Sequence, residues 1–73
     1  MIYTDGLHLV TDGDINELHE FAQSIGLKKT WFQEKLKKPH YDIWGVMVRN
    51  AINKGAKEVS SKEIIRILNN KQP

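Results

Sequence analysis

The chain has 73 residues, with 11 lysines and arginines, 9 acidic residues and no cysteine. This length is enough for one domain, which we expect over residues 1–70, with a frayed tail over 71–73. A chain without cysteine forms neither a disulfide nor a thiolate zinc site. The apolar stretches are far shorter than the ~20 residues of a membrane span, and the N-terminus lacks the pattern of a signal peptide. We therefore expect a cytoplasmic protein with no membrane partner.

Charge is divided unevenly along the chain. Residues 1–27 hold five acidic and no basic residues, whereas residues 28–73 hold all 11 basic residues and four acidic ones, giving formal charges of −5 and +7. Such polarity can orient a charged partner or favour head-to-tail association. Two solvated faces of opposite sign are the simpler explanation, so the oligomeric state stays open.

The first third of the chain has the pattern of two strands followed by a helix. Two β-favouring runs, 2–4 and 7–10, flank Asp5-Gly6. This predicts either a hairpin or a turn between strands that do not pair. Asp14 and Glu17 then form a capping-box pattern before apolar residues at helical spacing, which predicts a helix to about residue 25.

The middle of the chain has the pattern of two helices. A second capping-box pattern predicts a short helix over about 30–36, which Pro39 would end because the residue before proline avoids helical geometry. Asp42 stands where it would cap a third helix, over 43–54.

The last part of the chain has the pattern of a short strand and a final helix. Residues 57–59 are a candidate third strand, and Ser60 and Glu63 form a third capping-box pattern before a helix to about residue 70. We therefore expect an α+β domain in which a small two- or three-stranded sheet packs with three or four short helices.

A set of short motifs together resembles one protein family. The motifs are Asp12, Glu17-Leu18-His19, Phe21-Ala22, Ile25-Gly26, Trp31-Phe32-Gln33, Pro39-His40-Tyr41-Asp42 and Gly55-Ala56. On these residues, and over roughly 2–63, the chain resembles a family of small bacterial and phage proteins that is known only as a domain of unknown function. Members also place a histidine where His8 stands, and many carry a longer loop with Arg and Trp where Asp5-Gly6 stands here. The resemblance implies that the polar motif residues form one unit in an accessory protein of bacterial or phage origin.

Three histidines and one aspartate are the candidate catalytic residues: His8, His19, His40 and Asp42. Imidazole titrates near neutral pH and can move protons or bind metal, and two or three histidines with a carboxylate suit zinc, manganese or iron. The three histidines are therefore also the candidate metal ligands. They come from an expected strand, helix and loop, so their convergence depends on the fold. Each has a structural explanation as well, so we expect no bound metal and no cofactor.

A basic and aromatic segment adjoins these residues. Lysines neutralise phosphates, and aromatic rings stack on unpaired bases. The candidate ligand-binding residues are His40, Tyr41, Trp31, Lys35, Lys37 and Lys38. The alternative is that at least one ring is a core anchor and the lysines solvate a short helix.

Three functions follow, in decreasing order of preference. The first is a small accessory protein that binds a phosphate-bearing ligand, a nucleotide or nucleic acid, at a pocket of His, Asp, aromatic and Lys side chains. The second is a non-enzymatic module that binds a host protein, with the polar motif only holding the fold. The third is a metal-dependent hydrolase, and whether the chain is an enzyme stays open at this stage.

Overall fold

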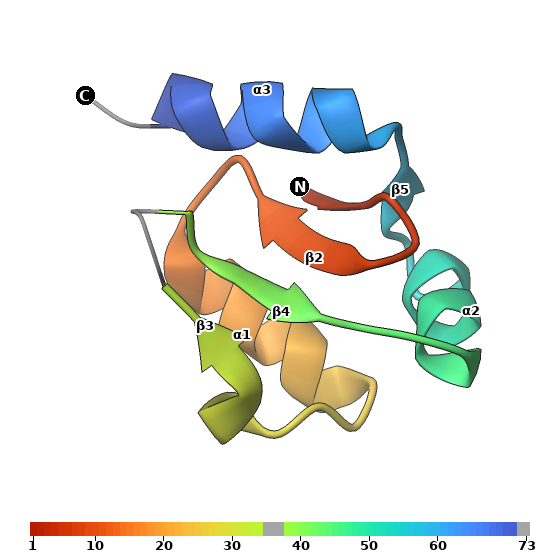
Figure 1. The fold of residues 1–73 in the computed structure, drawn as a ribbon. Coiled ribbons are helices and arrows are strands. Elements are labelled where there is room, and N and C mark those ends of the chain that lie inside the picture. The colour runs from red at the N-terminus through yellow and green to blue at the C-terminus, as the bar shows by residue number, and fades with distance from the viewer. Residues whose placement is uncertain (35–37, 72–73) are drawn as a thin grey trace.

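The computed structural model describes residues 1–34 and 38–71 and has an α+β architecture (Figure 1). In chain order the elements are β1 (Ile2–Thr4), β2 (His8–Thr11), α1 (Ile15–Ser24), the 3₁₀ helix η1 (Lys29–Trp31), β3 (Phe32–Gln33), β4 (His40–Asp42), α2 (Val46–Asn53), β5 (Lys57–Glu58) and α3 (Ser61–Lys71). Within these residues, no helix combines the length and the apolar composition needed to cross a membrane. Of the expected tail, residues 72 and 73 lie outside the described residues.

The strands form one mixed sheet in the order β3-β4-β2-β1-β5. The pairs β1–β2, β2–β4 and β3–β4 are antiparallel, and β5 pairs with β1 in parallel. The hairpin around Asp5-Gly6 is therefore confirmed, and so is a strand at 57–58. The sheet has five strands instead of two or three because β3 and β4 come from segments expected to be helix and loop.

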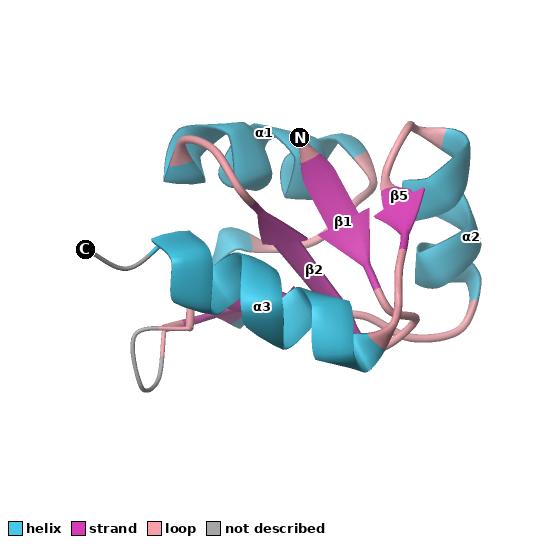
Figure 2. Ribbon diagram, turned by 90° about the horizontal axis from the view of Figure 1, so that it is seen from above, coloured by secondary structure: helices cyan, strands magenta, loops and turns pink. Residues whose placement is uncertain are grey.

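Helices cover both faces of the sheet. Figure 2 shows α1 and α3 on opposite sides of the strands. Alternate residues of β2 point to opposite faces, so Leu9 and Val10 enter different cores. The core on the α1 side contains Ile2, Leu9, Leu18, Ala22, Leu27, Tyr41, Ile43, Ala51 and Ala56. The smaller core beneath α3 contains Val10, Ile64 and Leu68. This division decides which polar side chains can meet.

Two of the expected helix caps are confirmed. The Asp14 carboxylate accepts a hydrogen bond from the Asn16 amide at 2.8 Å, and the Ser60 hydroxyl accepts one from the Glu63 amide at 3.2 Å. Both bonds satisfy amides that a helix start leaves without an intrahelical acceptor.

The prediction of a helix over 30–36 is wrong for residues 30–34, the part of this segment that the structure describes. The 3₁₀ turn ends at Trp31, and Phe32 and Gln33 then pair with Tyr41 and His40 as a strand. The Phe32 ring packs against the Tyr41 ring, with 5.3 Å between centroids, and this tertiary contact overrides the local capping pattern.

The expected role of Asp42 as a helix cap is also wrong. Asp42 is the last residue of β4, and α2 begins only at Val46, after Gly45, which has φ 57° and makes no side-chain cap. The chain stays extended past Asp42 because the Ile43 amide donates to the Leu7 carbonyl at 3.0 Å, which continues the pairing with β2. The Asp42 carboxylate is therefore available for another role.

The turn between β1 and β2 is held by the carboxylate of Asp5. It accepts hydrogen bonds from the amides of Leu7 (2.9 Å) and His8 (2.8 Å), and from the Ser61 hydroxyl (2.8 Å) at the start of α3. The side chain is only 1% exposed. Burial opposes ionisation, but these hydrogen bonds, together with one from the His8 ring, outweigh it and lower the pKa of Asp5 to about 2.

Replacing Asp5 is expected to destabilise the fold strongly. Asp5→Ala leaves several donors without their acceptor, so the free energy of unfolding should fall by about 2–4 kcal/mol, measured by urea denaturation at pH 7. Because the folded pKa is depressed, the stabilisation by Asp5 is present above the ordinary carboxyl pKa and is lost as the pH falls from about 4 towards 2.

The control for this prediction is Asp14→Ala, which removes one exposed helix cap and should cost about 1 kcal/mol. An Asp5→Ala variant no less stable than Asp14→Ala would show that Asp5 does not hold the turn.

Candidate functional site

Strands β2 and β4 bring three of the predicted site residues together on one face of the sheet. His8 lies opposite Asp42 in the pairing register, and His40 lies two residues before Asp42, so all three side chains share the α3 face. Each offers one ligand atom, and these atoms lie within 4.8 Å of one another. The His8 and His40 rings meet edge to face, with centroids 5.4 Å apart.

His40 is held between two hydrogen-bond acceptors. Its Nδ1 lies 2.7 Å from the Lys38 carbonyl oxygen, so Nδ1 carries a proton and donates it. Its Nε2 lies 3.3 Å from Oδ1 of Asp42, which also only accepts when ionised. A cation placed between or beside these two acceptors would be attracted to both of them.

His8 is oriented by the buried carboxylate of Asp5. Its Nδ1 lies 3.1 and 3.2 Å from the two carboxylate oxygens, so Nδ1 is the protonated nitrogen and Nε2 carries the lone pair. A carboxylate or carbonyl behind the far nitrogen is the usual arrangement around a metal-binding histidine. Both histidines of this site have such a partner, Asp5 for His8 and the Lys38 carbonyl for His40.

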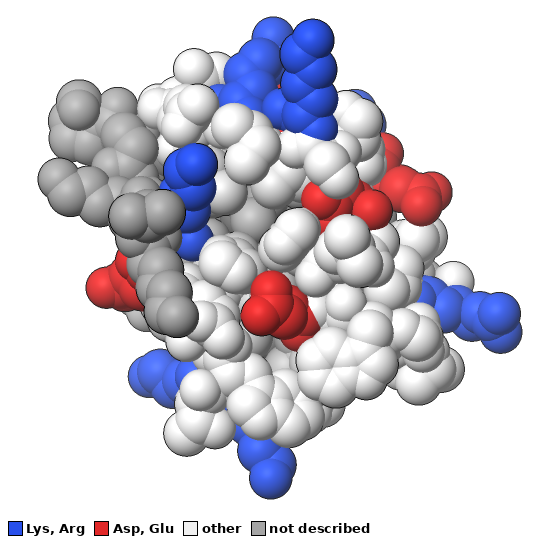
Figure 3. Space-filling model, in the orientation of Figure 1, with Lys and Arg blue, Asp and Glu red and all other residues white. Residues whose placement is uncertain are grey.

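The histidines open into a small cavity beneath α3. It has a volume of ≈ 120 Å³ and is lined by His8, Lys38, His40, Ile64, Ile65 and Leu68. The apolar side chains of α3 keep water away from one side of the histidines and so strengthen electrostatic interactions there. Figure 3 shows the face of the molecule in the orientation of Figure 1, with basic side chains mainly at its margins and uncharged surface around an acidic group near its centre.

His19 and Tyr41 lie on the other face of the sheet. The Tyr41 side chain is fully buried in the core on the α1 side, and burial raises the pKa of its hydroxyl. The Tyr41 hydroxyl and Nδ1 of His19 are 2.7 Å apart, and the His19 ring packs edge to face on Phe32. Two of the three histidines therefore converge, and His19 joins a polar contact across the sheet from them.

The remaining predicted ligand-binding residues are divided. Lys38 lines the cavity with the two histidines. Trp31 lies at the end of η1 and faces Trp44, with 6.2 Å between ring centroids. Lys35 and Lys37 lie outside the described residues.

A family model matches residues 4–71, from the last residue of β1 to the end of α3. The chain belongs to the family described as Protein of unknown function (DUF4031). No curated protein and no solved structure matches the chain. The match includes His8, His40 and Asp42, but the family description names no activity, so function is argued from the site.

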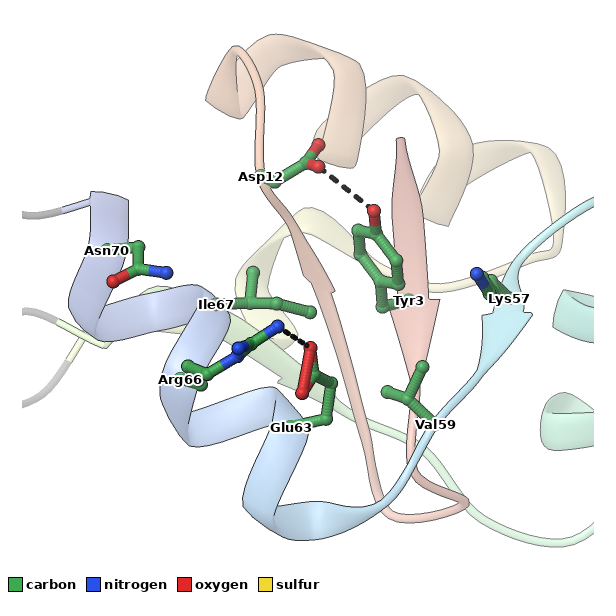
Figure 4. A pocket seen from close by; sticks show the side chains of 8 residues that line it. All are labelled: Tyr3, Asp12, Lys57, Val59, Glu63, Arg66, Ile67 and Asn70. Carbon is green, nitrogen blue, oxygen red and sulfur yellow. Dashed lines mark hydrogen bonds and ion pairs between the residues drawn. The ribbon is translucent and has the colours of Figure 1, made fainter.

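A wider hollow on the same side of the sheet offers less chemistry. It has a volume of ≈ 510 Å³ and lies between α3 and the β1–β5 edge (Figure 4). Its polar groups are largely satisfied by one another, since the Tyr3 hydroxyl donates to Asp12 at 3.0 Å and Arg66 donates to Glu63 at 2.8 Å. A ligand there would have to displace these contacts, so the histidine site is the stronger candidate.

Two residues of the site region were not among the sequence candidates. Asp5 was assigned only to a turn, although a carboxylate three residues before a strand histidine is a signal for the contact that it makes. Trp44 falls within the helix expected over 43–54 and was not singled out. Its contact with Trp31 depends on the approach of η1 to the end of β4, which no local sequence pattern predicts.

The contact between His19 and Tyr41 is expected to be structural. Tyr41→Phe removes the hydroxyl that pairs with the half-buried His19, and should lower the free energy of unfolding by about 1 kcal/mol in a denaturant titration. A double-mutant cycle with His19→Phe should return a coupling energy of similar size. A coupling near zero would mean that the two groups do not interact in solution.

Proposed function

We propose that the protein binds a divalent transition-metal ion through His8, His40 and Asp42, and uses the ion to bind a phosphate-bearing ligand. The observation that carries the proposal is the juxtaposition of Nε2 of His40 and Oδ1 of Asp42 at 3.3 Å, while Nδ1 of His40 donates to a carbonyl. Two acceptors at this distance favour a cation between or beside them.

The spacing of these atoms supports a metal ion. In a tetrahedral site with bonds of about 2.0–2.1 Å, neighbouring ligand atoms lie about 3.3 Å apart. The pair of His40 and Asp42 already has this separation, and a ligand atom of His8 lies within 4.8 Å of both. Two histidines and one carboxylate suit zinc, manganese or ferrous iron.

Three protein ligands leave at least one position open on the ion. A phosphate oxygen could take this position, and Lys38, one of the residues that line the cavity, would add positive charge for the same anion. A water molecule bound there instead of the phosphate would ionise near neutral pH. Its hydroxide oxygen would bond to the phosphorus atom of an ester beside the ion, while the bond from phosphorus to the alcohol oxygen breaks and the alcohol leaves with a proton. Hydrolysis of a phosphate ester is therefore the first reaction to test.

The cellular role that we propose is that of a small cytoplasmic accessory protein of bacterial or phage origin. The support is the motif resemblance together with the absence of cysteine, which agrees with a reducing compartment.

Metal binding is expected to stabilise the protein. Zinc or manganese at 100 times its dissociation constant should add about 2.7 kcal/mol, which raises the melting temperature of a domain this small by roughly 10–20 °C. Differential scanning fluorimetry of chelator-treated protein measures the shift, and isothermal titration calorimetry should give one ion per chain.

Matched histidine variants identify the ligands. His40→Ala and Asp42→Asn should abolish the metal-induced shift, whereas His19→Gln, on the opposite face of the sheet, should keep it. If neither ion shifts the melting temperature of the unaltered chain, the metal site is excluded.

Phosphate binding is expected to depend on both the ion and Lys38. Inorganic phosphate should bind the zinc-loaded protein and not the metal-free protein, as measured by calorimetry at 50 mM salt. Lys38→Ala should weaken phosphate about ten-fold without changing zinc affinity, because it removes one charge–charge contact. Lys54→Ala, at the end of α2 and away from the cavity, is the control. Equal phosphate affinity with and without metal would contradict the proposed role of the ion.

A further inference from the structure

Two tryptophans form an aromatic cleft next to the histidine site. Trp31 comes from the end of η1, and Trp44 from the connection between β4 and α2. Their rings lie 6.2 Å apart between centroids, at an angle of 42°. With Thr30, Gln33 and Asp42 they line a cleft of ≈ 240 Å³, which we call the tryptophan cleft.

Neither indole is used by the fold as a core residue. The Trp44 side chain is among the most exposed large apolar groups at 58%, Trp31 is 37% exposed, and neither packs in a core cluster. An interplanar angle of 42° prevents the two rings from stacking face to face on each other. Both rings therefore keep surface that a third planar group could cover, and exposed aromatic surface of this kind commonly marks a binding site.

Asp42 connects the tryptophan cleft to the histidine site. Its Oδ1 lies 3.3 Å from Nε2 of His40, and the same residue lines the cleft between the indoles. A ligand bound to an ion at His8, His40 and Asp42 would thus have the tryptophans beside it, within the reach of one small molecule.

The remaining residues of the tryptophan cleft are polar but uncharged. The Gln33 amide both donates and accepts hydrogen bonds, and the Thr30 hydroxyl does the same. Such groups match the edges of a nucleobase, whereas a purely apolar peptide side chain would leave them without partners.

We propose that the tryptophan cleft binds the base of a nucleotide whose phosphate is held at the histidine site. Aromatic rings stack on bases without strong preference for their identity, since every base has a π-face. The ligand class is thus a nucleoside phosphate, either free or at the end of a strand. This inference rests on the proposed phosphate site, and the experiment below separates failure of the two.

Zinc-loaded protein is titrated with adenosine 5′-monophosphate, ribose 5-phosphate and adenosine, with tryptophan fluorescence and calorimetry as readouts. The nucleotide should bind at least ten-fold more tightly than ribose 5-phosphate and quench the fluorescence. A 5′-phosphorylated tetrathymidylate compared with thymidine monophosphate tells a strand end from a free nucleotide, since only a strand end gains affinity from the added residues.

Variants assign the added affinity to the indoles. Trp44→Ala should reduce nucleotide affinity to that of ribose 5-phosphate and leave the affinity for ribose 5-phosphate unchanged, and Trp44→Phe should retain part of the difference. Ile52→Ala, which removes an exposed apolar side chain of α2, should change neither affinity.

The outcomes separate the base site from the phosphate site. If ribose 5-phosphate binds the zinc-loaded protein as tightly as the nucleotide, the base site is overturned while the phosphate site stands. If neither phosphate binds, the phosphate site fails. Adenosine alone then decides the base site, because its binding should quench the fluorescence of the unaltered protein and should be lost in the Trp44→Ala variant. Self-association that Trp44→Ala disrupts, without any nucleotide effect, would identify the cleft as a protein contact and overturn the inference.

Discussion

The antiparallel pairing of β2 with β4 is the constraint on which the site depends. Its register sets His8 opposite Asp42 and Leu9 opposite Tyr41, so a polar set and an apolar set are fixed on opposite faces by the same backbone contacts. A slip of one residue would turn His40 and Asp42 towards α1 and expose Tyr41 to the α3 side. Because Leu9 and Tyr41 are fully buried, the core itself enforces the register that assembles the histidine site.

The carboxylate of Asp5 links this register to the rest of the molecule. It closes the β1–β2 turn through the Leu7 and His8 amides, orients the His8 ring, and holds the start of α3 through Ser61. The same buried charge therefore stabilises the fold and sets which nitrogen of His8 can bind a cation. Folding and site geometry are coupled at one side chain, which is why a turn residue is as important to the site as its ligands.

Local patterns in the sequence predicted the elements that depend on local interactions. The Asp5-Gly6 hairpin, the Asp14 cap and the Ser60 cap need only neighbouring residues, and all three are present. The errors concern tertiary contacts. The sequence predicts a helix at Phe32 and Gln33, but these residues pair with β4. It predicts a helix cap at Asp42, but Asp42 continues a strand. In both places the conformation is set by a pairing partner that is distant in the chain. The expectation of no bound metal stays a prediction. The approach of His8 to His40, on which a metal site would depend, follows from the same pairing. The separation of His19 from them by the sheet depends on it as well.

A cation at His8, His40 and Asp42 is the central claim, and X-ray diffraction at the zinc absorption edge tests it most directly. Crystals grown with zinc should show an anomalous difference peak for one zinc ion. The ion should lie about 2.0–2.2 Å from one nitrogen each of His8 and His40 and from a carboxylate oxygen of Asp42. The protonated Nδ1 atoms should remain on Asp5 and the Lys38 carbonyl. No peak at this position at saturating zinc, with His40 instead donating directly to Asp42, would contradict the claim.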